Sequence, residues 1–77
     1  MTNIELKKEL INELTINSNT WFSVGILTIK IFAKEPNYKA NRNIYRKRIY
    51  RCLNYFKRIN IVEVRNLNIE EYKWRIS

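Results

Sequence analysis

The chain has 77 residues, which is enough for one domain with a single modest core. Its composition is 45% hydrophobic and 13% aromatic, which favours a folded chain over a disordered one. Fifteen Lys and Arg against seven Asp and Glu give a formal charge of +8, so we expect a negatively charged partner. A chain this short is marginally stable alone, which also makes a homodimer an expectation.

The residue inventory argues against catalysis. The chain has no His and no Asp, and its only glycine, Gly25, cannot build a phosphate-cradling loop. No zinc or calcium ligand pattern is present, so we expect no enzyme activity, no cofactor, no metal and no small-molecule substrate. The only cysteine, Cys52, cannot form an internal disulfide, which is compatible with a reducing cytosol.

The hydrophobic pattern also bears on location. No uninterrupted apolar run approaches the roughly 18 residues that a membrane span requires. The polar, acidic N-terminus does not look like a signal peptide. These two features predict an intracellular, cytoplasmic protein that makes no contact with a membrane.

The first predicted element is a helix over residues 3–14. Thr2 and Glu5 fit a capping box, and Leu6, Leu10 and Leu14 recur at helical spacing. The polar residues 15–20 that follow predict a loop.

A second helix is predicted over residues 21–33. This stretch is mostly apolar and β-branched, but it is longer than a typical strand and carries a helical apolar face. Pro36 ends the element because the residue before proline is disfavoured in a helix. Residues 39–43 are expected to form a basic loop. Trp21, Phe22 and Phe32 are assigned to the core, together with Phe56 and Trp74.

The third predicted helix covers residues 42–59 and is the most informative element. Its apolar residues at 49, 52, 53, 56 and 59 share one face, where Cys52 is expected to be a small buried hydrophobe. Tyr45 is placed on the same inward face. The opposite face is polar and basic, with no acidic residue between Lys39 and Arg58. Asn60 suits a left-handed stop.

A β-hairpin is predicted after this helix. Residues 61–65 and 70–76 alternate in the manner of strands, and residues 66–69 provide an Asn-rich turn. The complete pattern predicts an α+β domain over residues 1–77: three helices and a C-terminal hairpin around one shared core, with the basic face of the third helix outward.

The stretch from Ile49 to Val64 resembles the recognition helix and wing of the winged helix-turn-helix DNA-binding superfamily. Asn60 stands where that family usually has glycine, and the connection before the third helix looks longer than a tight turn. The resemblance implies that the third helix enters the major groove of DNA while the hairpin, or wing, contacts the backbone or minor groove.

The candidate site residues divide by chemistry. Arg can read guanine and Asn can read adenine through paired hydrogen bonds, whereas other cations hold phosphates and set affinity. The candidates for base edges are Asn43, Lys47, Tyr50, Arg51 and Asn54. The candidates for phosphate contacts are Lys39, Arg42, Arg46, Arg48 and Arg58. The candidates on the wing are Arg65, Asn66, Asn68 and Lys73.

The leading interpretation is therefore a small transcriptional regulator that binds double-stranded DNA in a sequence-specific way. Any homodimer is expected to form through the first helix. One alternative is a protein-interaction module that docks on an acidic protein, because Ile44 and Tyr55 would be partly outward on the third helix. Another is RNA binding through the same basic helix.

Overall fold

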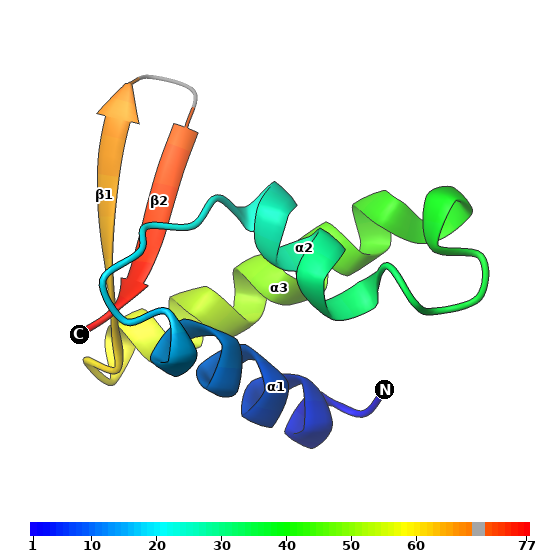
Figure 1. The fold of residues 1–77 in the computed structure, drawn as a ribbon, viewed down its shortest axis with the longest axis horizontal. Helices are drawn as coiled ribbons and strands as arrows, with labels where there is room; N and C mark the ends of the chain where they lie inside the picture. The colour runs from blue at the N-terminus through cyan, green and yellow to red at the C-terminus, as the bar shows by residue number, and fades with distance from the viewer. Residues whose placement is uncertain (69–70) are drawn as a thin grey trace.

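A computed structural model describes residues 1–68 and 71–77 of the protein (Figure 1). Their fold confirms the predicted α+β class: three helices are followed by a two-stranded antiparallel hairpin. In chain order the elements are α1 (Asn3–Ile16), α2 (Val24–Phe32), α3 (Tyr38–Arg58), β1 (Val62–Asn68) and β2 (Glu71–Ile76).

Helix α1 begins as predicted and runs two residues further. The Thr2 hydroxyl accepts a hydrogen bond from the Glu5 N–H at 3.1 Å, and the Thr2 N–H donates to the Glu5 carboxylate at 3.2 Å, which confirms the capping box. The helix continues to Ile16 because the Asn17 side-chain amide donates to the Glu13 carbonyl at 3.2 Å.

Helix α2 is shorter than predicted because residues 21–23, at the start of the predicted helix, are not helical. Ser23 is the N-cap, and its hydroxyl accepts a hydrogen bond from the Ile26 N–H. Phe22 is extended and exchanges two backbone hydrogen bonds of 2.8 Å with Trp74 of β2. The connection between α1 and α2 is thereby fixed to the edge of the hairpin.

Helix α3 starts four residues earlier than predicted, so the expected basic loop at residues 39–43 is wrong. Asn37 adopts a left-handed conformation, φ 62°, and turns the chain directly into the helix. The half-buried Tyr45 ring stacks on Phe32 at 4.3 Å and lies parallel to Tyr38 at 6.2 Å, which packs the new first turns against α2. The connection is therefore residues 33–37 only. Asn60 is left-handed at φ 62°, as predicted.

Strand β1 runs three residues further than predicted, to Asn68, whereas β2 begins at Glu71 instead of the predicted residue 70. The register of the hairpin pairs Val62 with Ile76 and Val64 with Trp74, and an irregularity follows Asn66. The predicted turn at residues 66–69 is wrong for residues 66–68, because these belong to β1. Ile69 and Glu70 lie outside the described residues.

One core joins all the elements, as expected. Trp74 is 2% exposed, and Cys52 is 7% exposed on the inner face of α3. Burial raises the pKa of the Cys52 thiol, which keeps it neutral. The other fully buried apolar side chains are Leu6, Leu10, Leu14, Leu27, Phe32, Ile49 and Leu53.

Candidate nucleic-acid interface

The outer face of α3 carries the candidate site. Its inner face is buried against the core through Ile49, Cys52, Leu53 and Phe56, which fixes the rotation of the helix. The opposite face is therefore turned to solvent. The exposed candidates on α3 are Lys39, Arg42, Asn43, Arg46, Lys47, Tyr50, Arg51 and Arg58, with Asn54 half-buried among them.

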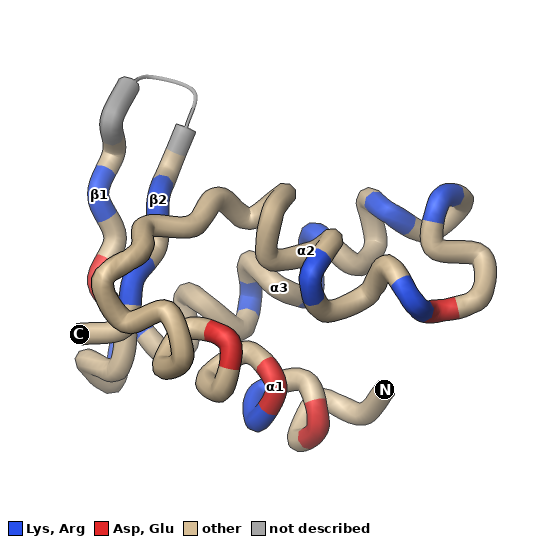
Figure 2. The backbone as a smooth tube through the Cα atoms, in the orientation of Figure 1, with Lys and Arg blue, Asp and Glu red and all other residues tan. Residues whose placement is uncertain are grey.

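The acids lie elsewhere. Three of the seven glutamates are on α1, and none is on α3. Figure 2 shows acidic positions along α1 with basic ones beside them, basic positions on α2, α3 and both strands, and an acidic position on β1. A face with cations and no acidic side chains attracts a polyanion, because its cations are not already paired with carboxylates of the same face.

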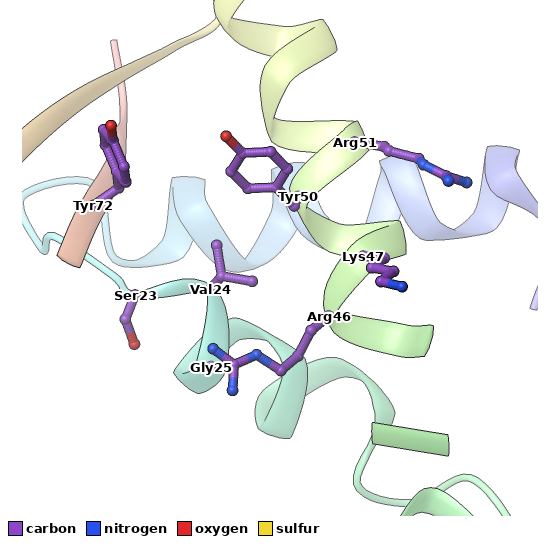
Figure 3. Close-up of a pocket in the computed structure, with 8 residues that line it drawn as sticks. All are labelled: Ser23, Val24, Gly25, Arg46, Lys47, Tyr50, Arg51 and Tyr72. Atoms are coloured by element: carbon purple, nitrogen blue, oxygen red, sulfur yellow. The ribbon is translucent and has the colours of Figure 1, made fainter. Parts of the chain in front are cut away.

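A hollow of about 460 Å³ lies where α3, the start of α2 and strand β2 meet. Tyr50 and Tyr72 stand on opposite sides of it, and the Arg46 side chain reaches toward the α2 turn at Gly25 (Figure 3). Lys47 and Arg51 line its outer edge and point away from the two tyrosines.

A second groove, of about 700 Å³, continues along α3 toward its C-terminus. It is lined by Tyr50, Arg51, Asn54, Lys57 and Arg58. Most of the predicted helix residues therefore form one strip. Several lining residues were not among the candidates: Lys57, on the same helix, Tyr72, which faces α3 from the wing, and Ser23, Val24 and Gly25 at the start of α2. The sequence signal for Tyr72 was its two-residue spacing from the inward Trp74.

Arg48 does not belong to this strip. It is half-buried, and its guanidinium donates to the Met1 carbonyl at 2.8 Å and to the Asn3 side-chain oxygen at 3.2 Å. It also lies 5.5 Å from the centre of the Phe32 ring. Arg48 therefore connects α3 to the start of α1, and the structure separates it from the other candidates.

The wing candidates divide between two faces of the hairpin. Asn66 is exposed and pairs with Tyr72, which lines the hollow beside α3. Arg65 and the half-buried Lys73 pair with each other one position along, so they lie on the face turned away from α3. The side chain of Asn68 lies outside the described residues.

Trp21 lies on that outer face of the hairpin and not in the core. It was expected in the core, but it is half-buried, and the guanidinium groups of Arg65 and Arg75 lie 4.6 and 4.4 Å from its ring centre. Arg75 also pairs with Glu63, its Nε donating to the carboxylate at 2.8 Å. A guanidinium that lies over an aromatic ring can still donate hydrogen bonds, because its N–H groups point outward in the guanidinium plane.

No family model matches the chain, and no curated protein or solved structure is significantly similar to it. Among the described residues, no helix combines the length and apolar character needed to cross a membrane. Over the same part of the chain, no three His, Cys, Asp or Glu residues gather in a way that could hold a metal ion.

Proposed function

We propose that the protein is a winged-helix transcriptional regulator that binds double-stranded DNA in a sequence-specific way. The observation that carries this proposal is the outer face of α3, which has exposed cations and amides along its length and no acidic residue. An α-helix fits the major groove, where Arg and Asn can read base edges.

The arrangement around α3 supports the same proposal. The hairpin follows α3 directly, and Trp74 of β2 meets the Tyr50 ring of α3 edge-on, with ring centres 6.0 Å apart. A duplex lying along α3 would then meet the hairpin beside it, where Asn66 is exposed on the face next to the helix. Of the three helices only α1 carries acidic residues, so α3 is the helix that a polyanion would approach more readily.

Binding of short, random-sequence duplexes, measured by fluorescence anisotropy over a salt series, tests the proposal. We expect tight binding at low salt and a log–log slope of several units, since each neutralised phosphate contributes about 0.9. Absence of binding at the lowest salt would refute the proposal.

A matched pair of variants locates the interface. Lys47→Ala and Lys8→Ala remove the same charge from two exposed positions, one on α3 and one on α1. Lys47→Ala should lower the salt slope by about 1, whereas Lys8→Ala should leave it close to wild type. Equal losses in both variants would mean that only net charge matters and that α3 is not the interface.

Specificity has its own test at Arg51. After selection of a preferred site, Arg51→Ala should weaken binding to it by about 1–3 kcal/mol and relax the preference at one base pair. A variant that keeps both affinity and preference would remove Arg51 from base reading.

A protein partner is the second candidate function. Ile44 and Tyr55 are 58% and 37% exposed, and they line a groove between α1 and α3 with Leu6 and Cys52. Exposed apolar side chains beside a groove favour docking of a protein. A specific partner should survive nuclease treatment in a pull-down and be lost with Ile44→Glu, whereas loss on nuclease treatment alone would leave DNA as the ligand.

A further inference from the structure

The hollow between α3, α2 and β2 combines aromatic side chains with a volume suited to a small ligand, and binding of a fully paired duplex requires neither. Two of its lining side chains are the exposed tyrosines Tyr50 and Tyr72, 45% and 49% accessible, on two different elements. Its volume of about 460 Å³ falls within the roughly 300–1,000 Å³ that is usual for small-ligand sites.

The packing behind the hollow holds one of these rings in place. Tyr50 meets the buried Trp74 edge-on, with ring centres 6.0 Å apart and planes at 89°. Trp74 is itself fixed by its two backbone hydrogen bonds to Phe22. Tyr72 comes from the same strand two residues earlier, so the spacing between the two tyrosines is set by the docking of the hairpin on α3.

The charged side chains around the hollow are all basic. Arg46 reaches toward the first turn of α2, which contains no acidic residue (Figure 3). Lys47 and Arg51 lie at its rim and point outward. A ligand with an aromatic body and more than one negative group matches this layout. A neutral apolar molecule would make no ion pairs with these cations.

A nucleotide has both features, but only when its base is unstacked. In a paired duplex the bases present their edges in the grooves, and their faces are covered by neighbouring bases. A base that has left the stack exposes a face, and proteins bind such faces with aromatic side chains.

Resting on the proposed DNA-binding function, we propose that this hollow accommodates one unpaired nucleotide of a DNA strand. The base lies between Tyr50 and Tyr72, its phosphate meets Arg46, and a flanking phosphate meets Lys47. The protein would then prefer a duplex that contains an unpaired nucleotide over one that is fully paired.

The test compares two duplexes of identical sequence, one fully paired and one with a single bulged nucleotide, by fluorescence anisotropy. Stacking of one base on an aromatic side chain is worth about 1–3 kcal/mol, so wild type should prefer the bulged duplex by roughly 5- to 150-fold. A third duplex whose bulge lacks the base should lose that preference. Equal preference for the abasic bulge would overturn the proposal, because it would mean that the protein reads backbone shape.

Variants of Tyr72 identify the surface responsible. Tyr72 is half-accessible and outside the core, so Tyr72→Ala should fold; it should lose the preference for the bulge, and Tyr72→Phe should keep it. Tyr55→Ala, on another side of α3, is the matched control and should behave like wild type. A Tyr72→Ala protein that keeps the full preference would overturn the proposal.

The same measurement separates this inference from the function on which it rests. Equal binding of paired and bulged duplexes by wild type would overturn the inference and leave DNA binding intact. Binding of neither duplex would remove both. Excess deoxyadenosine monophosphate should not displace the bulged duplex, because it lacks the flanking phosphate; displacement would make a free nucleotide the ligand and overturn the assignment to a DNA strand.

Discussion

Trp21 and Arg65 form a contact between an aromatic ring and a guanidinium on the outer face of the hairpin, 4.6 Å apart. At an exposed site such a contact is worth about 0.5–1 kcal/mol. A double-mutant cycle with Trp21→Ala and Arg65→Ala, followed by urea unfolding, should give a coupling free energy of that size. Additive effects of the two substitutions would mean that Arg65 gains nothing from the ring.

Cys52 gives a residue-scale prediction about pH. Burial raises the pKa of its thiol in the folded state, so unfolding becomes easier once pH exceeds the ordinary pKa of a cysteine. The stability that this group contributes is present at neutral pH and is lost as pH rises toward the folded-state pKa. We expect the free energy of unfolding to fall more steeply at alkaline pH in wild type than in Cys52→Ala, measured by urea unfolding across that range. Parallel curves would contradict the prediction.

Arg48 and Trp21 also mark where residue-scale prediction from the sequence fails. The helical periodicity of α3 correctly predicted that Ile49, Cys52, Leu53 and Phe56 are inward. It was wrong for Ile59, which was placed on the same face but is 46% exposed at the C-cap of the helix. It could not show that the outward-leaning Arg48 would meet the chain terminus, because its partners Met1 and Asn3 are more than 40 positions away. Trp21 was assigned to the core by its hydrophobicity, but a strand-like bridge at Phe22 turns its neighbour to the outer face.

At the scale of elements, the sequence predicted the number, order and type correctly and misplaced several boundaries. The four added residues at the start of α3, 38–41, contain only one residue packed against the core, Tyr38, so they have no amphipathic pattern to detect. Tertiary stacking on Tyr45 and Phe32 holds them. Likewise the Asn-rich stretch at residues 66–68 has turn propensity, but pairing with β2 extends it as a strand.

Asn60 gives the element-scale prediction, because it ends α3 in a left-handed conformation at φ 62°. Asn tolerates this region and Gly does so without strain, whereas other residues pay about 1–2 kcal/mol. Asn60→Gly should therefore keep or slightly raise the free energy of unfolding, and Asn60→Val should lower it by at least that amount. Chemical denaturation of the two variants measures the difference, and equal stability of both would contradict the role of this conformation.

At the scale of the whole molecule, the core and the candidate interface depend on each other. Residues from all three helices and both strands meet in one core, and the hollow beside α3 exists only because the hairpin docks there. A disturbance of the hairpin should therefore reach the helices. The size of the effect on the helices should depend on whether the substituted hairpin side chain lies in the core or on the surface.

Trp74 and Tyr72 test this coupling from the same strand face. Trp74 is 2% exposed and Tyr72 is 49% exposed. Replacing a buried Trp with Ala costs about 3–5 kcal/mol, which is most of the stability that a small domain has. We expect Trp74→Ala to lose helical circular dichroism at room temperature, although Trp74 is not in a helix, and Tyr72→Ala to retain it. A Trp74→Ala protein with intact helices would mean that the three helices fold without the hairpin.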